Sequence, residues 1–464
     1  MMEAPRFHLV MTVALRAELP RDGCGVVPVF SVKDQGPLAV DPSIRVCVVV
    51  TGVGLDASRK AALWIAETFR PLYVMNIGLC GTTQREDDLN TWFQPTIVQN
   101  EKGDLFCLPD VLPISFPLKC SKVSALTSCE KPVSQNPLIP THLVDMEAFA
   151  QASVLQPRGI SFHCLKSVSD RLDPSRPTFR QAIPRFHDDL EQLFQTFFSP
   201  KPKITVVIPT FNRAGWMSAC VESVLSQKTQ PYEVIVVNDG STDHTKKKLE
   251  PYKNQVKVIT LDENRGVSHA RNVGIAHAKG DWIATLDSDD QWKPRKLESQ
   301  LAFLSAAPFY KILQSEEIWV RNGKHLNPKK IHQKPEGWAW APCLERCLIS
   351  PSSVLFQKSM CSELGGFDET LPVCEDYDFW IRVTRKWPIG FDRTKMVVKF
   401  GGHSDQLSSS YEVMDHYRIK SLKKALAEEA NPIYQEKIAA VLQKKCQIVE
   451  NGRRKRSIEL LLRI

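Results

Sequence analysis

The sequence predicts a chain built from two α/β domains. From residue 204 to residue 286, apolar runs of four to six residues alternate with amphipathic segments, which is the order of βαβ units around a parallel sheet. The first half of the chain alternates in a similar way. Between the halves, the stretch Phe-Phe-Ser-Pro-Lys-Pro-Lys at 197–203 ends a helical pattern with two prolines. At 464 residues the chain is also too long for one hydrophobic core.

Each expected element follows from its local pattern. In the first half we expect a helix at 57–69, strands at 46–50 and 73–77, and long loops where turn formers gather, at 31–40 and 99–140. In the second half we expect four strands and three helices: strands at 204–209, 234–237, 256–261 and 282–286, and helices at 215–227, from 242 onward and at 267–278.

The tail of the chain has its own character. From 411 to 448, leucines and alanines recur three or four residues apart among lysines and glutamates, so we expect amphipathic helix that packs on the second domain. The chain carries a net charge of +8, and residues 415–464 hold 12 Lys or Arg against 6 Asp or Glu, which gives 12 − 6 = +6. We therefore divide the chain into domains at 1–197 and 203–410 and a basic helical tail at 411–464.

Composition excludes several classes of protein. Hydrophobic residues make up 43% of the chain and charged residues 24%, as in soluble globular proteins, and no apolar run reaches the roughly 18 residues of a membrane span. The first residues lack the basic and apolar regions of a secretory signal, so we expect a cytoplasmic protein. The 13 cysteines form no Cys-x-x-Cys pair, which argues against a disulfide framework or a zinc knuckle.

One basic cluster leaves two interpretations open. Arg453, Arg454, Lys455 and Arg456 are consecutive. They either contact anionic lipid at the inner face of a membrane, or an acidic partner, or form the solvated end of a helix. The charge pattern gives no support to nucleic-acid binding.

Three carboxylates follow the predicted strand at 282–286. Asp287, Asp289 and Asp290 come directly after this apolar run. Ligands of an open α/β sheet gather at the carboxyl ends of its strands, so we expect these acids to face a crevice. Hard oxygen ligands suit Mg²⁺ or Mn²⁺, and such a cation would carry phosphate. The alternative is a solvated acidic turn before the next helix.

Polar residues also follow the two preceding strands. A turn formed by Pro209, Thr210, Asn212 and Arg213 can present backbone groups and a guanidinium to a nucleotide. Asp239, after the next strand, can accept a ring N–H of a base. The alternative is that Asn-Asp-Gly-Ser-Thr-Asp at 238–243 is an ordinary turn between strand and helix.

The predicted helix at 267–278 carries a candidate phosphate ligand. Gly266, Ala270 and Gly274 give it a face of small residues, which permits close approach to a neighbour or a ligand. Arg271, on the same helix, can hold a diphosphate through two parallel hydrogen bonds.

In this order, the motifs between 209 and 289 resemble the family 2 glycosyltransferases of the GT-A fold. The segments Gly-Gly-Phe-Asp-Glu at 365–369 and Cys-Glu-Asp-Tyr-Asp-Phe-Trp at 374–380 are similar to the acceptor side of that family, whose Glu-Asp pair supplies the catalytic base. The resemblance covers about 203–410. It implies Asp376 as the base with Glu375 as second choice. It also implies that Asp287 binds the nucleotide sugar, and that Asp289 and Asp290 bind metal.

The resemblance implies an inverting transfer that depends on Mn²⁺ or Mg²⁺. The donor would be a UDP- or GDP-sugar, and the acceptor a glycan, a lipid-linked compound or a small molecule of the cell envelope or of secondary metabolism. His403, in a Gly-Gly-His-Ser segment similar to a late loop of some members, either completes the metal site or is an ordinary loop histidine. The Gln-x-x-Arg-Trp motif of processive synthases is absent, which favours a single addition.

The first half shows a second resemblance, to the purine nucleoside phosphorylase and methylthioadenosine nucleosidase superfamily. Five segments carry it: 12–19 with Glu18, 51–54, 76–81 with Gly81, 144–147 with Met146 and Glu147, and 167–170 with Ser169 and Asp170. The resemblance implies that Asp170 protonates a departing purine, that Glu147 binds ribose hydroxyls and that Glu18 holds the attacking water. It also implies a homodimer.

Alternatives to the transferase remain open at this point. Only 62 residues separate Gly81 from Val144, which is short for that superfamily, so the first domain is either an active nucleosidase or a trimmed, inactive one. The whole chain could then be a nucleosidase that cleaves the N-glycosidic bond of a purine nucleoside, with an accessory second domain. It could also be a fusion that binds nucleotides without turning them over.

Overall fold

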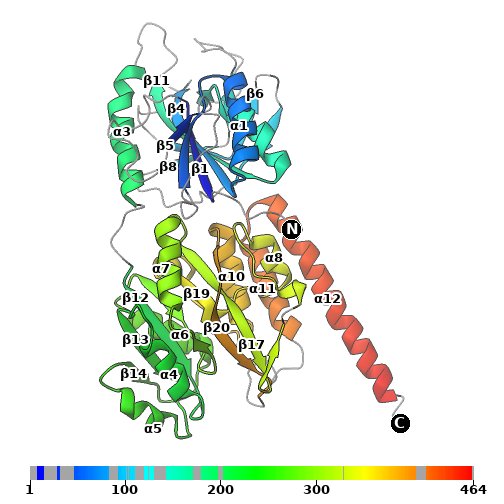
Figure 1. Ribbon diagram of the computed structural model, residues 1–464. Coiled ribbons are helices and arrows are strands. Elements are labelled where there is room, and N and C mark those ends of the chain that lie inside the picture. Colours follow the sequence, from blue (N-terminus) through cyan, green and yellow to red (C-terminus); the bar gives the residue numbers. More distant parts are fainter. Residues whose placement is uncertain are drawn as a thin grey trace. The chain divides into compact units, whose positions relative to one another are not determined.

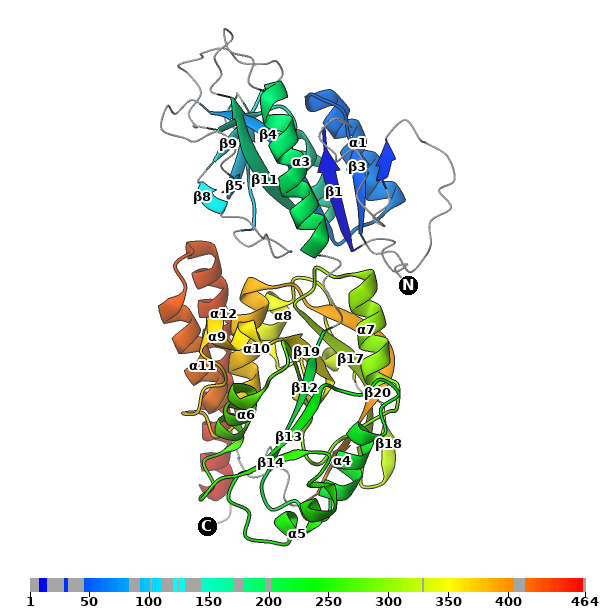
Figure 2. The ribbon, with the colours of Figure 1, turned by 90° about the vertical axis from the view of Figure 1, so that its left-hand side faces the viewer.

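The computed structural model describes residues 8–14, 29–31, 46–82, 92–100, 102, 104–109, 120–123, 125–129, 143–170, 179–196, 202–327, 329–403 and 414–461. The chain forms two compact units, each an α/β structure as the sequence predicts (Figures 1 and 2). Unit 1 comprises Met1–Ser199 and Leu304–Phe309, and unit 2 comprises Pro200–Phe303 and Tyr310–Ile464. Among the described helices, none has the length and apolar character that crossing a bilayer requires.

Unit 1 is built on a sheet of 11 strands. Its centre is parallel, because β1 pairs with β3 and β4, and β4 pairs with β11. The strands are β1 (Leu9–Val13), β2 (Val29–Ser31), β3 (Val46–Val50), β4 (Tyr73–Thr82), β5 (Trp92–Pro95), β6 (Ile97–Asn100), β7 (Leu105–Cys107), β8 (Cys120–Val123), β9 (Leu126–Ser128), β10 (Leu143–Asp145) and β11 (Ser161–Asp170). The helices are α1 (Leu55–Thr68), α2 (Ala148–Leu155) and α3 (Phe179–Thr196).

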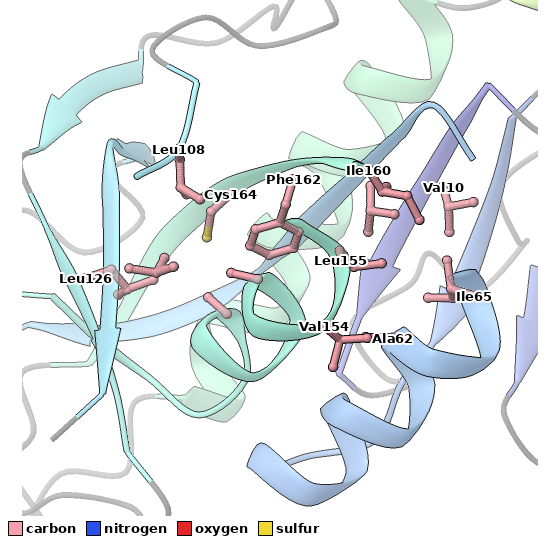
Figure 3. Packing of buried hydrophobic residues seen from close by; sticks show 14 of the residues in the cluster. Val10, Ala62, Ile65, Leu108, Leu126, Val154, Leu155, Ile160, Phe162 and Cys164 are labelled. Atoms are coloured by element: carbon pink, nitrogen blue, oxygen red, sulfur yellow. The ribbon is translucent and has the colours of Figure 1, made fainter. Parts of the chain in front are cut away.

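The core of unit 1 lies between its parallel strands and two helices. Ala62 and Ile65 of α1 and Leu155 of α2 belong to one buried cluster with Val10 of β1 and Phe162 of β11 (Figure 3). The segment at 99–140, predicted as loop, contains short strands β7, β8 and β9. Strands of three or four residues offer too few positions for an alternating pattern to stand out from a turn-rich background.

Unit 2 contains a sheet of nine strands in the order β14-β13-β12-β15-β19-β17-β20-β16, with β18 paired to β17. The strands are β12 (Ile204–Thr210), β13 (Glu233–Asn238), β14 (Lys257–Thr260), β15 (Trp282–Thr285), β16 (Gln291–Trp292), β17 (Ile312–Arg321), β18 (Lys324–Leu326), β19 (Val354–Gln357) and β20 (Gly390–Gly401). The helices are α4 (Met217–Leu225), α5 (Thr245–Leu249), α6 (Val267–His277), α7 (Lys296–Ala306), α8 (Trp340–Glu345), α9 (Ser359–Leu364), α10 (Glu375–Lys386), α11 (Met414–Glu428) and α12 (Pro432–Leu461).

The topology of unit 2 places a site at one edge of the sheet. Strands β12, β13, β14 and β15 are parallel. The chain moves outward from β12 to β13 and β14 and then returns to the other side of β12 as β15, so the strand order reverses between β12 and β15. Ligand sites of open α/β sheets form at such a reversal, outside the carboxyl ends of the strands.

Helix α6 lies unusually close to this sheet. A Cβ atom added at Gly274 would come within 2.4 Å of Val207 Cγ1, so the predicted small-residue face contacts the strands themselves.

The tail forms two helices, because Pro432 lacks a backbone N–H and begins α12 as a new helix. Leu422 of α11 and Ile438 of α12 join a buried cluster with Tyr377 of α10.

Candidate active site

The acids that follow β15 have separate roles. Asp290 is 2% exposed, and both of its carboxylate oxygens accept hydrogen bonds from protein donors. Ser352 Oγ donates to Oδ2 at 2.6 Å, and the Phe400 N–H donates to Oδ1 at 3.1 Å. Burial raises the pKa of Asp290 well above its usual value. The structure thus places this predicted metal ligand as an anchor between the β15 turn and β20.

Asp289 lies beside His403. The two side chains are 19% and 14% exposed, and Asp289 Oδ2 lies 3.1 Å from His403 Nε2. Burial, together with the neighbouring charge of Asp287, raises the pKa of Asp289. The indole of Trp216 lies 5.2 Å from the imidazole, measured between ring centroids, and supports it from the side.

The residues at this point fit a divalent cation. A carboxylate oxygen and an imidazole nitrogen are ligands that Mn²⁺ and Mg²⁺ accept. Within the described ranges, no three His, Cys, Asp or Glu side chains group closely enough to hold a metal by themselves. A pair of protein ligands suits a cation that takes its remaining oxygens from a diphosphate and water, which is the usual way in which proteins hold Mg²⁺ with a nucleotide.

Arg271 connects the donor-side acids to helix α10. Its guanidinium is 3% exposed, and its two terminal nitrogens bind different carboxylates. Nη2 lies 2.7 Å from Asp287 Oδ1, and Nη1 lies 2.6 Å from Glu375 Oε1. The ring of Phe367 lies 5.2 Å from the guanidinium carbon. Arg271 was predicted to hold a diphosphate, but the structure gives each terminal nitrogen a carboxylate partner.

The two candidate bases differ in exposure and in partners. Glu375 is buried, and burial together with the charge of Asp376 raises its pKa to about 7 in spite of Arg271. Asp376 is only partly buried, and its Oδ2 accepts a hydrogen bond from the Cys347 thiol at 3.2 Å. Cys374, before them, has a φ of 60°, a strained conformation for a residue with a side chain. This turn directs α10 toward Arg271.

The turns after β12 and β13 are tied to one another. Asn212 has a φ of 51°, and its Oδ1 accepts the Thr242 N–H at 2.8 Å. The backbone N–H of Arg213 donates to Thr245 Oγ1 at 2.9 Å. Burial and Asp287 raise the pKa of Asp289, and the Arg213 charge partly offsets this rise, so the guanidinium belongs to the site. Pro209 and Thr210 end β12 as buried residues. These four predicted residues therefore shape one wall of the site.

Both carboxylate oxygens of Asp239 accept hydrogen bonds from the protein backbone. Its Oδ1 accepts the Arg265 N–H at 3.0 Å and its Oδ2 accepts the Gly266 N–H at 2.8 Å. The next residue, Gly240, has a φ of 67°, and a Cβ there would lie 2.5 Å from the carbonyl carbon of Glu263. The predicted base ligand thus fixes the loop before α6 against the turn after β13.

Residues that the sequence analysis did not identify complete this edge of unit 2. Ser352 accepts the Asp287 N–H at 3.1 Å as well as donating to Asp290. Nearby, Lys334 Nζ lies 3.2 Å from Glu317 Oε1, and both side chains are 4% exposed. Burial raises the pKa of Glu317, but the charges of Lys334 and Lys399 outweigh this effect and lower the pKa to about 2. No local sequence motif marks these residues, because each finds its partner from a distant segment.

The nucleosidase-like residues of unit 1 are described only in part. Glu18 lies outside the described residues. Gly81 and Asp170 pair in register at the ends of β4 and β11, and the side chain of Asp170 lies outside the described part. Ser169 Oγ donates to the Cys80 carbonyl at 3.1 Å, and Met146 lies beside Glu147 before α2.

A buried lysine faces Glu147. Lys166 Nζ lies 3.7 Å from Glu147 Oε2 and 2.9 Å from Asp145 Oδ2, and all three side chains are buried. Asp145 also accepts hydrogen bonds from Ser128 Oγ at 2.5 Å and from the Ala148 N–H at 3.0 Å. Asp145 thus has three donors. Lys166 lies between Asp145, its nearer partner, and Glu147, the carboxylate that the resemblance assigns to ribose.

Comparison with solved structures gives low overall similarity for both units. The crystal structure of Staphylococcus aureus TarS 1–349 in complex with UDP-GlcNAc has 22% identity and a TM-score of 0.46, and covers 52% of this chain and 72% of that one. The 5′-methylthioadenosine/S-adenosyl homocysteine nucleosidase of Helicobacter pylori has 14% identity and a TM-score of 0.32, over 41% of this chain and 96% of that one. This second likeness says nothing about the activity of unit 1.

Curated relatives match somewhat less than half of the chain. An uncharacterized glycosyltransferase of Rickettsia felis is 31% identical over 46% of this chain and 36% of its own length, and this chain spans about a third of the first such relatives. The UDP-Glc:alpha-D-GlcNAc-diphosphoundecaprenol beta-1,3-glucosyltransferase WfgD of Escherichia coli is 30% identical over 39% of this chain and 70% of its own. The sequence model of glycosyl transferase family 2 matches residues 205–359. The chain therefore belongs to glycosyl transferase family 2.

Proposed function

We propose that this chain is an inverting, metal-dependent glycosyltransferase that adds a single sugar from a UDP- or GDP-sugar to an acceptor hydroxyl. The observation that carries the proposal is the pair of ion contacts made by Arg271. They join Asp287, on the donor side, to Glu375, at the start of the acceptor-side helix. The E. coli relative, named for its UDP-glucose donor and a lipid diphosphate acceptor, supports an acceptor from the cell envelope; a secondary metabolite is the alternative acceptor.

In the proposed reaction, the acceptor oxygen attacks the anomeric carbon as the bond from that carbon to the diphosphate oxygen breaks. Asp376 takes the proton of the attacking hydroxyl, because it is the partly exposed member of the Glu-Asp pair. Glu375 has a different task, since it is buried and bound to Arg271. A single displacement inverts the configuration of the sugar.

The cation site has a supporting task in this scheme. Asp289 and His403 would hold Mn²⁺ or Mg²⁺, which stabilises the negative charge that develops on the leaving diphosphate. Asp290 fixes the position of Asp289 relative to His403, because it binds the backbone of Phe400, three residues before His403. Arg213 adds a fixed positive charge near Asp289.

Calorimetric titration with UDP and GDP, each with and without Mn²⁺, tests the donor site. Wild type should bind one of the two in a metal-dependent manner, and Asp289→Ala should lose this binding. Asp281→Asn is the matched control, because Asp281 lies just before the amino end of β15, opposite to the site, and should bind like wild type. Absence of binding to either nucleotide would contradict the proposal.

Asp376→Asn separates catalysis from binding. We expect it to keep nucleotide affinity and to lose both transfer and the slow hydrolysis of the donor sugar, by at least about 100-fold. Glu375→Gln should keep part of the activity. Binding without any turnover in wild type would favour the fusion that only binds nucleotides.

For unit 1 we propose an appended nucleosidase-like module whose Glu147 lies beside Lys166. The contact to Lys166 favours a degenerate module, because it competes with ribose for the same carboxylate. Release of adenine from methylthioadenosine by wild type, lost in Asp170→Asn, would instead establish a second activity.

A further inference from the structure

The segment from Arg321 to Lys334 has an unusual charge pattern. It contains five Lys or Arg and no Asp or Glu, in a chain whose net charge is +8. Arg321, Lys324, Lys329 and Lys330 are exposed. The acids nearest in sequence are used elsewhere, since Glu317 pairs with Lys334 and Glu336 pairs with Arg393. Among the described residues, these four cations have no carboxylate partner in an ion pair.

Two large apolar side chains are exposed among these cations. Leu326 is 45% exposed and Ile331 is 50% exposed. We call the surface formed by Arg321, Lys324, Leu326, Lys329, Lys330 and Ile331 the basic hairpin face. Single exposed apolar residues are common on soluble proteins. Here two of them occur within a run of cations, and this combination fits a partner that is both anionic and apolar.

The basic hairpin face is contiguous. Arg321 pairs with Lys324 and Trp319 with Leu326 across β17 and β18. The Trp319 ring lies 5.3 Å from the ring of His332, which follows Ile331. Figure 2 shows β18 at the margin of unit 2. It pairs with β17, which separates it from β20.

The hairpin turn holds this face in one conformation. Asn322 and Gly323 have φ values of 49° and 74°, as in the two-residue turns that match the twist of paired strands. A Cβ at Gly402 would lie 2.5 Å from Asn322 Oδ1, so the turn also contacts the end of β20. Arg321 and Lys324, which flank this turn, are therefore presented on a rigid element.

We propose that the basic hairpin face docks this protein on an anionic membrane surface. Lysine and arginine near an anionic bilayer are attracted to its headgroups, while leucine and isoleucine enter the boundary with the acyl chains. A soluble polyanion would use the cations but gain little from Leu326 and Ile331. Arg321 pairs with Gly401, two residues before His403. If the proposed function holds, docking would bring the donor site close to lipid-linked acceptors.

The test is sedimentation of the full chain with vesicles of phosphatidylcholine alone or with 30% phosphatidylglycerol. Wild type should bind only the anionic vesicles, and less at high salt. Each cation should contribute about fivefold to the affinity for anionic vesicles, so the combined variant R321S/K324S/K329S/K330S should bind them at least 100-fold more weakly. The variant L326S/I331S should bind them about tenfold more weakly. Thermal unfolding of each variant verifies folding.

The chain offers a matched control in another exposed lysine run. Lys246, Lys247 and Lys248 on α5 are exposed and have no large exposed apolar side chain within the run. K246S/K247S/K248S should bind vesicles like wild type. The proposal would be overturned if this control lost as much vesicle affinity as the combined variant. It would also be overturned if vesicle affinity fell only when the Arg453–Arg456 cluster was replaced. The proposal would also be overturned if the protein bound soluble polyphosphate tightly and the variant L326S/I331S bound vesicles as well as wild type does. Nucleotide binding is a separate readout, so failure of docking does not imply failure of the proposed function.

Discussion

The charge cluster around Arg271 should make the stability of unit 2 depend on pH. One guanidinium faces two carboxylates, Asp287 and Glu375, so one carboxylate is in excess. Burial, with the nearby charge of Asp376, raises the pKa of Glu375 from 4.5 to about 7. Between these values the folded state holds a proton that the unfolded state has lost. Stability should therefore fall as pH rises through this window.

The size of the effect follows from the same values. The difference between 4.5 and about 7 corresponds to about 3 kcal/mol, at 1.36 kcal/mol for each pH unit. Glu375→Gln removes the titrating group and keeps a side chain that can accept a hydrogen bond from Arg271. The variant should lose the decline in stability, so that the difference in unfolding free energy between variant and wild type grows by about 3 kcal/mol from pH 4.5 to pH 8.

Urea unfolding followed by tryptophan fluorescence measures this difference, since all tryptophans except Trp64 and Trp92 lie in unit 2. The measurement is repeated at half-unit steps of pH for wild type, Glu375→Gln and the control Glu363→Gln. Glu363 is an exposed glutamate of α9, and its replacement should leave the pH profile unchanged. Parallel profiles for wild type and Glu375→Gln would refute the reasoning.

Three further substitutions test other parts of the structure. Ser352→Ala leaves Asp290 Oδ2 without its donor and should lower the unfolding free energy by about 1–3 kcal/mol, with weaker nucleotide binding by calorimetry. Gly274→Ala forces a Cβ to within 2.4 Å of Val207 Cγ1 and should cost about 1–3 kcal/mol in urea unfolding, whereas an unchanged midpoint would contradict the close packing of α6. Lys166→Met leaves two buried acids uncompensated and should destabilise unit 1 by about 3–5 kcal/mol, visible as an earlier transition in limited proteolysis.

The sequence was sufficient for the elements that position the site. The strands β12, β13 and β15 end within one or two residues of the predicted positions, because each apolar run stops where polar residues begin. The three acids after β15 lie within four consecutive residues, so their place at a strand end could be predicted. The hydrogen-bond partners of Asp290 could not, because they lie 62 and 110 residues away, at Ser352 and Phe400.

Other contacts of the site are also long-range. Asp239 was predicted to bind the base from its place after a strand, and this stays a prediction; its backbone donors, 26 and 27 residues later, could not be predicted from that place. Lys166 lies in a buried strand, where neither charge pattern nor spacing indicates that it faces Glu147. Charged groups of this kind are paired through the fold, so local periodicity carries no information about them.

The contact between the β13 turn and the loop before α6 constrains how this protein can change over time. Asp239 occupies two backbone donors of that loop, and Gly240 leaves no space for a side chain against Glu263. A residue inserted into either segment would separate the carboxylate from both donors at once. Viable descendants should therefore vary the length of these two loops together or not at all, even where their donor sugars differ.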